Sequence, residues 1–219
     1  MSIAQNLQNL TSQIPSFVTL VAVSKTKPTE DILEAYNHGQ RIFGENKIQE
    51  MVDKYNQLPK DIKWHMIGHL QRNKVKYMAH FVDLIHGVDS LKTLKEINKQ
   101  AQKHNRVINC LLQIKIAIED SKFGLAANDA ASLLESSEFL EMENVSVVGL
   151  MGMASFTSDD HQVRNEFKLL KSTFDELSIN NQQLTTISMG MSGDYKIAIE
   201  EGSTMIRVGS SIFGKRNYV

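Results

Sequence analysis

The sequence of 219 residues predicts a (β/α)8 TIM barrel that occupies residues 1–219 as a single domain. Short apolar runs rich in β-branched residues alternate with helical patterns, which is typical of parallel strands joined by helices. Eight such runs can be counted, so the sheet can close on itself. The alternative, an open doubly wound sheet, is disfavoured because no Gly-x-Gly-x-x-Gly follows the first strand.

Each predicted strand is an apolar run followed by polar residues or glycine. In chain order the eight runs are Thr19 to Val23, Arg41 to Phe43, Lys63 to Ile67, Val82 to His86, Val107 to Ile114, Val145 to Met151, Thr185 to Ser188 and Thr204 to Val208.

A predicted helix follows each strand. These helices begin near Thr29, Lys47, Gln71, Ser90, Asn128, Asp159, Asp194 and, most weakly, Ser210. Ser90 and Asn128 are residue types that cap helix N-termini. An extra N-terminal helix is expected over Ile3 to Ile14, with an apolar side that would cover the barrel floor or flank.

The composition excludes several classes of protein. Lys and Arg number 24 against 25 Asp and Glu, which argues against a general nucleic-acid binder. No stretch reaches about 18 apolar residues and the start has no signal-peptide pattern, so we expect a cytoplasmic protein without a membrane segment. Cys110 is the only cysteine, so no internal disulfide can form, and its apolar surroundings predict burial.

Lys25 follows the first strand run, two residues after Val23. In such barrels the active-site residues lie at the C-terminal ends of the strands. An ammonium at the end of a buried strand is costly to desolvate, so a lysine there can act as an amine nucleophile that forms imines with carbonyl compounds. The alternative is a lysine that only reaches solvent.

The residues of two predicted loops indicate an anion-binding site. Met191, Ser192 and two glycines lie between the seventh strand and its helix, and Gly209 and Ser210 follow the eighth strand. Backbone N–H groups at such turns attract anions, and barrel enzymes commonly bind phosphate after strands seven and eight. Arg207, near the end of the eighth strand, adds a fixed cation or forms a structural ion pair. An amine, a cation and a phosphate site together suggest pyridoxal 5'-phosphate.

Several motifs then carry a resemblance over nearly the whole chain. They are Ala22 to Pro28, Phe43 to Asn46, Trp64 to Lys74, Gly149 to Met151, Ser188 to Asp194, Gly202 to Gly209 and Ile212 to Gly214. With these motifs the chain resembles the pyridoxal 5'-phosphate homeostasis proteins, the YggS/PROSC family, which is similar to the barrel domain of alanine racemase.

The resemblance implies a role for each candidate residue. Lys25 would form the internal aldimine, while Asn46 and Met191 would line the cofactor. The phosphate would be held by Ser192, Gly209 and Ser210. Arg207 would face the pyridine nitrogen and keep it unprotonated, which disfavours the carbanion chemistry of most enzymes that use this cofactor.

The expected function is therefore a non-catalytic carrier that buffers or delivers the cofactor. The resemblance implies apo forms of pyridoxal phosphate enzymes as recipients. The chain ends directly after the last barrel element, so we expect neither the second domain of the racemases nor an obligate dimer, and a monomer follows. The alternatives are a weak amino-acid racemase and an aldolase that uses Lys25 on a phosphorylated sugar.

Other polar residues allow more than one interpretation. His65 and His69 are four residues apart but lie in a strand and a loop, so no metal site is expected. His86 could face the barrel mouth. Lys27 could raise the local positive potential or lie on the rim, and Lys122 could accept cofactor transiently or be a solvated loop lysine.

Overall fold

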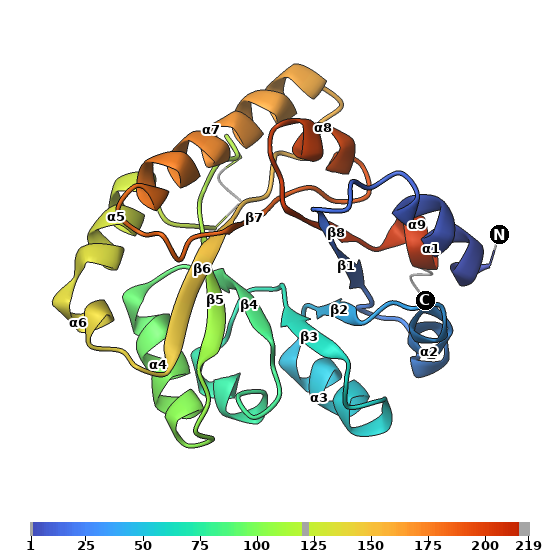
Figure 1. Ribbon diagram of the computed structural model, residues 1–219, viewed down its shortest axis with the longest axis horizontal. Helices are drawn as coiled ribbons and strands as arrows, with labels where there is room; N and C mark the ends of the chain where they lie inside the picture. The colour runs from blue at the N-terminus through green and yellow to red at the C-terminus, as the bar shows by residue number, and fades with distance from the viewer. Residues whose placement is uncertain (1, 120–122, 215–219) are drawn as a thin grey trace.

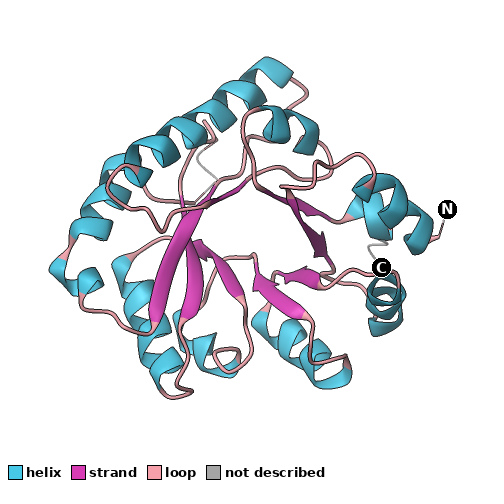
Figure 2. Cartoon of the chain, in the orientation of Figure 1, coloured by secondary structure: helices cyan, strands magenta, loops and turns pink. Residues whose placement is uncertain are grey.

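A computed structural model describes residues 2–119 and 123–214 of the protein. Eight parallel strands form a closed barrel in which each strand pairs with its sequence neighbours and β8 pairs with β1. Helices surround this ring of strands (Figures 1 and 2). The barrel that the alternating pattern predicts is confirmed.

The strands are short and most of their residues are buried. Their bounds are β1 Thr19–Val23, β2 Ile42–Glu45, β3 Lys63–Met66, β4 Leu84–Val88, β5 Ile108–Gln113, β6 Val145–Met151, β7 Thr186–Ser188 and β8 Met205–Val208. Strand β4 begins two residues later than the sequence predicts. Val82 still belongs to the preceding turn, since its N–H donates to the Met78 carbonyl, and the ladder starts when Asp83 N–H donates to Trp64.

The helices begin within about one residue of the predicted starts. Their bounds are α1 Ile3–Thr11, α2 Thr29–Asn37, α3 Ile48–Gln57, α4 Leu91–Gln102, α5 Ala127–Glu135, α6 Ser137–Leu140, α7 Asp160–Ser178, α8 Tyr195–Glu200 and α9 Ser210–Phe213. The segment after β3 is a 3₁₀ helix, η1 Arg72–Tyr77, where the sequence predicts an ordinary helix. The short helix α6 is not predicted. No helix among the described residues is both long and apolar enough to span a membrane.

The N-terminal helix α1 packs on the flank of the barrel. A capping box between Ser2 and Gln5 starts it, and it ends at Thr11, three residues before the predicted end at Ile14. It packs against α9 and α2, and Asn6 Nδ2 donates to the Ile212 carbonyl at 2.9 Å. Figure 1 shows α1 beside α9, so the first helix covers the seam where the last strand meets the first.

Side chains of the strands alternate between two buried regions. The outward side chains pack under the helices, where Phe43 and Trp64 lie with ring centroids 6.1 Å apart. Cys110 is buried in this outer layer as predicted, and burial raises the pKa of its thiol. The inward side chains form a smaller apolar cluster inside the barrel, made of Val21, Leu84, Leu111, Met151 and Met205.

Candidate functional site

The seven candidate residues gather in one part of the barrel mouth. They follow or end four strands that are neighbours in the ring, β7, β8, β1 and β2. Ser210 is exposed and Arg207 is buried, whereas the other five, Lys25, Asn46, Met191, Ser192 and Gly209, are half-buried. Residues from both ends of the sequence thus meet at the C-terminal ends of adjacent strands.

The loop that carries Lys25 is fixed by a buried cluster outside the barrel. Ser24 Oγ donates to Glu45 Oε1 at 2.6 Å, and Lys54 Nζ, from α3, donates to the same Glu45 oxygen and to the Ser24 carbonyl, both at 2.8 Å. Lys54 also contacts Glu50, whose Oε1 accepts from the Thr26 N–H at 2.6 Å. Every residue next to Lys25 is therefore held by a hydrogen bond.

Glu45 is the centre of this cluster. It is fully buried, and burial raises its pKa to about 7, while Lys54 and Ser24 act in the opposite direction. In the sequence, Glu45 lies after the second predicted strand, Arg41 to Phe43. The structure instead makes it the last residue of β2, with its side chain between the sheet and α3, because Phe43, two residues earlier, faces the same way.

The loops after β7 and β8 contact each other directly. Ser192 Oγ accepts from the Gly209 N–H at 3.3 Å, and the Arg207 N–H donates to the Gly190 carbonyl at 2.9 Å. Within the first loop, Asp194 Oδ1 accepts from the Met191 N–H at 2.5 Å. Burial raises the pKa of Asp194, against the effects of that hydrogen bond and of the Arg207 charge.

Gly190 allows this loop to turn back on its own helix. Its φ of +98° is rarely adopted by other residues, and a Cβ there would lie 2.6 Å from the Ala198 side chain and 2.9 Å from Tyr195 Cα. Only glycine fits both the backbone angle and the close approach.

Lys27 joins the two sides of the site. Its Nζ donates at 2.6 Å to the carbonyl of Phe213, the last residue of α9, whose first residue is Ser210. A cation at a helix C-terminus is stabilised by the carbonyl groups there. This hydrogen bond fits the position on the rim that the sequence allows, and the effect of the Lys27 charge on Lys25 stays a prediction.

Arg207 lies inside the barrel with its guanidinium buried. Its Nη1 donates to Ser188 O and Ser188 Oγ, at 2.9 and 2.6 Å, and its Nη2 donates to the Gly152 carbonyl at 3.1 Å. Burial lowers the pKa of the guanidinium to about 10, against the effect of Asp194. Among the described residues, no carboxylate lies within ion-pair distance of it, so the structural ion pair allowed by the sequence is absent there.

Asn46 is positioned by a residue that the sequence did not single out. Gly68, after β3, packs so closely that a Cβ on it would lie 2.4 Å from the Asn46 carbonyl oxygen. Any larger residue at position 68 would displace the Asn46 backbone. The one signal for this contact in the sequence is the glycine of the short Ile67-Gly68-His69 segment after the third strand.

The histidines do not line the mouth as a group. His86 is fully buried and contacts His65 and Ser188 inside the barrel, rather than facing the opening. His69 lies on the exposed loop, with its ring centroid 5.5 Å from that of Phe123. In residues 2–119 and 123–214, no group of three or more His, Cys, Asp or Glu side chains is arranged to hold a metal ion. Lys122 lies outside the described residues.

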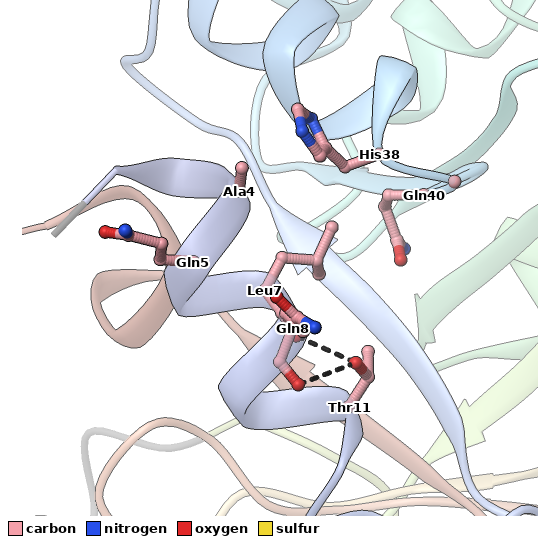
Figure 3. A pocket seen from close by; sticks show the side chains of 8 residues that line it. Ala4, Gln5, Leu7, Gln8, Thr11, His38 and Gln40 are labelled. Atoms are coloured by element: carbon pink, nitrogen blue, oxygen red, sulfur yellow. Dashed lines mark hydrogen bonds between the residues drawn. The ribbon is translucent and has the colours of Figure 1, made fainter.

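One surface pocket lies away from this site (Figure 3). It is lined by α1 and by the segment after α2, with Leu7, Thr11, His38 and Gln40 among its residues. Gln40 Nε2 donates to the carbonyls of Leu20 and Ile42, at the ends of β1 and β2 opposite Lys25. The pocket therefore belongs to the packing of the N-terminal helix and does not open to the barrel mouth.

Comparison with known proteins gives one consistent result. Residues 1–217 match the family model described as alanine racemase, N-terminal domain. A pyridoxal phosphate homeostasis protein of Aquifex aeolicus is 42% identical over 201 residues, which cover 91% of this chain and 87% of that protein. One of Vibrio alginolyticus is 39% identical over 233 residues, with 99% of each chain covered.

A solved structure is similar over the same range. PipY of Synechococcus elongatus PCC7942 is 36% identical, and the match covers 97% of this chain and all of that one. The TM-score is 0.92 for its structure without PLP and 0.88 for its structure with PLP bound.

Proposed function

The chain belongs to the alanine racemase N-terminal domain family and, within it, to the pyridoxal phosphate homeostasis proteins, and from this premise we propose that it binds pyridoxal 5'-phosphate as a Schiff base on Lys25 and buffers or delivers it. We propose that residues 1–219 act as one domain in this role. The observation that carries the proposal is that two features lie in the same part of the mouth. One is a lysine at the end of β1, and the other is the Ser192–Gly209 contact between the loops after β7 and β8.

The residues fit the chemical groups of the cofactor. Val21 faces the barrel interior and Ser24 faces α3, so the alternation of β1, continued past its end, directs Lys25 towards the barrel axis. There its amine would bond the cofactor aldehyde with loss of one water. The hydroxyl of Ser192 and the loop around Gly209 and Ser210 would hold the phosphate.

Arg207 supports a binding role rather than catalysis. Its three hydrogen bonds all run from Nη1 and Nη2, so within the described structure Nε is the guanidinium nitrogen not engaged by protein. An N–H donor facing the pyridine nitrogen would keep that nitrogen unprotonated. The bound cofactor supplies an electron sink for amino-acid chemistry, and an unprotonated ring makes it a weak one.

Asn46 and Met191 would line the cofactor from either side of Lys25. Both are half-buried, and both have their backbones fixed, by Gly68 and Asp194 respectively. All seven candidate residues come from one barrel, so the proposed site needs no second copy of the chain. We propose apo forms of pyridoxal phosphate enzymes as the recipients.

The first experiment tests the lysine. The purified protein is incubated with pyridoxal 5'-phosphate, its absorbance spectrum is recorded, and the complex is reduced with borohydride and mapped by peptide analysis. We expect a chromophore and a pyridoxyl group on Lys25, both lost in Lys25→Ala.

Lys92→Ala is the control, because it removes an exposed lysine on α4, outside the proposed site. It should keep the chromophore and the label on Lys25. A wild-type protein that stays colourless after incubation would overturn the proposal and favour the aldolase alternative.

Catalysis is tested separately, by following exchange of the α-hydrogen of amino acids with solvent in the presence of the loaded protein. A carrier should show no steady exchange. Sustained exchange that is lost in Lys25→Ala would contradict the non-catalytic role and establish racemase-type chemistry.

A further inference from the structure

Several polar side chains of the described residues lie inside the barrel, among apolar ones. His65, His86, Ser188 and Arg207 are 2%, 0%, 0% and 4% exposed. Leu84 and Met205, two residues before His86 and Arg207 on the same sides of their strands, belong to the interior apolar cluster. Buried polar groups destabilise a fold unless they are hydrogen-bonded, so their contacts need an explanation.

These side chains form a continuous series of contacts. Arg207 Nη1 lies 2.6 Å from Ser188 Oγ, and Ser188 Oγ lies 3.1 Å from His86 Nδ1. His86 Nε2 lies 3.0 Å from His65 Nδ1, and His65 Nε2 lies 3.4 Å from Asp83 Oδ2. Asp83 is the residue before β4, at the opposite end of the strands from Lys25, and its side chain is 44% exposed.

The two ends of the series fix its direction. A guanidinium can only donate hydrogen bonds and a carboxylate can only accept them. Ser188 Oγ accepts from Arg207, so its own hydrogen can be donated to His86 Nδ1. His86 then carries its hydrogen on Nε2 and donates to His65 Nδ1, and His65 Nε2–H donates to Asp83.

The opposite direction leaves two mismatches. His86 Nδ1–H and Arg207 would both donate to Ser188 Oγ, whose hydrogen would lose its acceptor in the series. At the other end, an unprotonated His65 Nε2 would face the Asp83 carboxylate, so two acceptors would meet. Buried unsatisfied groups of this kind are strongly disfavoured.

Burial favours the neutral form of both rings. It lowers the pKa of His65, against the effects of the hydrogen bond to Asp83 and of the Asp83 charge, and it lowers that of His86 well below its ordinary value, with the Arg207 charge acting in the same direction. The hydrogen bond from His65 lowers the pKa of Asp83, as do Lys63 and Arg106 to a smaller extent. Asp83 is therefore the anionic end of the series and Arg207 the cationic end.

We propose that Ser188, His86, His65 and Asp83 are positioning residues that hold Arg207 in one orientation, through a one-directional hydrogen-bond chain that crosses the barrel to its opposite rim. In this chain both histidines are neutral and carry their hydrogen on Nε2. The effect on cofactor binding rests on the proposed function, since it assumes that Arg207 contacts the cofactor ring. The tautomers of the two histidines do not depend on it.

The first test measures the tautomers in the protein without added ligand. Long-range ¹H–¹⁵N spectra at pH 7 report which ring nitrogen of each histidine carries hydrogen, and His65 and His86 are assigned from single variants. We expect the Nε2–H pattern for both rings. An Nδ1–H tautomer or an imidazolium at either position would overturn the proposal.

The second test breaks the chain next to Arg207. Ser188→Ala removes the hydroxyl and leaves the Ser188 carbonyl in place for Nη1. We expect the Kd for pyridoxal 5'-phosphate to rise about tenfold, the size of effect typical for one lost hydrogen bond to a charged group. Borohydride labelling should still map to Lys25 at saturating cofactor.

The matched control is Ser203→Ala. Ser203 is equally buried near β7 and β8, but within the described part of the chain its hydroxyl bonds to the backbone carbonyls of Ile187, Met189 and Met205 and to no side chain. Its Kd should stay within about twofold of wild type. If the wild type is labelled on Lys25 and Ser188→Ala binds as tightly, the positioning role is wrong while the proposed function stands. A wild type that does not bind contradicts the proposed function instead.

A third variant, Asp83→Asn, tests the chain from its exposed end, where a change is tolerated if Ser188→Ala fails to fold. The amide oxygen can accept from His65 Nε2–H as the carboxylate does, and Arg207 still fixes the direction at the other end. We expect both rings to keep the Nε2–H pattern. A ring that changes to the Nδ1–H form in this variant would overturn the proposal.

Discussion

At the scale of single residues, the buried histidines and the buried Glu45 change stability with pH in opposite directions. Burial lowers the pKa of His65 and His86 below 6.5, and burial raises that of Glu45 from 4.5 to about 7. Between pH 5 and 7 these two histidines bind protons in the unfolded chain but stay neutral in the folded protein. Their contribution to stability therefore falls as the pH falls. Glu45 contributes stability at low pH, and that contribution is lost as the pH rises towards 7.

We therefore predict that the pH dependence of stability changes in His86→Gln. Each histidine that stays neutral in the fold lowers the free energy of unfolding by about 1.4 kcal/mol per pH unit below 6.5. The variant should lose one such contribution, while Glu45 acts equally in both proteins and cancels from the difference. Urea unfolding at pH 7, 6 and 5 measures it, and parallel curves for the two proteins would contradict a neutral, buried His86.

At the scale of elements, α3 holds the loop that carries Lys25. Lys54 reaches from α3 to Ser24, directly after β1, to Glu45 at the end of β2 and to Glu50 of its own helix, with its side chain only 7% exposed. A helix outside the barrel thus determines where the first loop lies at the mouth. The cluster is a buried ion pair whose two charges depend on each other.

We predict that Lys54→Met lowers the free energy of unfolding by about 3–5 kcal/mol at pH 8, because the Glu45 carboxylate is left buried without its cation. Adding Glu45→Gln should restore a large part of the loss. Urea unfolding of the two single variants and the double variant gives the coupling.

Lys92→Met, an exposed lysine on α4, is the control and should change the stability by less than about 0.5 kcal/mol. Additive losses in the Lys54 and Glu45 variants would show that the two side chains act independently, contrary to the structure.

The sequence predicts the elements well because a parallel sheet needs apolar runs at regular spacing, and every one of the eight runs became a strand. It predicts the ends of elements less well. The helix expected near Gln71 is a 3₁₀ turn, and β4 starts late because hydrogen bonds of the preceding turn hold Val82. Such choices depend on tertiary contacts that local patterns do not contain.

The candidate residues of the site were accessible from the sequence because each one follows a strand or, in the case of Arg207, lies near the end of one. The residues around them were not. The series from Arg207 to Asp83 joins β8, β7, β4 and β3, and β4 lies across the barrel from β7 and β8. Period-two alternation directs His65 and His86 inwards, but which inward side chains meet depends on how the closed ring packs.

At the scale of the whole molecule, α1 stabilises the closure of the ring. Leu7 and Leu10 are buried, and the helix is tied to the Ile212 carbonyl of α9 and to Glu34 of α2. It therefore bridges the helices next to the β8–β1 seam. Loss of its packing should destabilise the entire barrel, because a barrel that opens there loses a ladder.

We predict that Leu7→Ala lowers the free energy of unfolding by about 2–5 kcal/mol, the range for a buried leucine truncated in a core. Leu140→Ala is the control, since that side chain is 69% exposed, and it should have little effect. Urea unfolding followed by circular dichroism measures both. A loss of less than about 1 kcal/mol for Leu7→Ala would mean that α1 is an accessory to the barrel.

The hydrogen bond from Lys27 to Phe213 joins residues 186 positions apart in the chain. It links the loop of Lys25 to the helix that begins at Ser210, so the amine and the proposed phosphate loop become neighbours only after the last strand has docked beside the first. A contact of this sequence separation forms late when the chain folds from an open state, because the intervening loop must first close. The capacity to capture a ligand would accordingly be among the last properties that the folding chain acquires, and a partly folded chain would not compete with the finished protein for the cofactor.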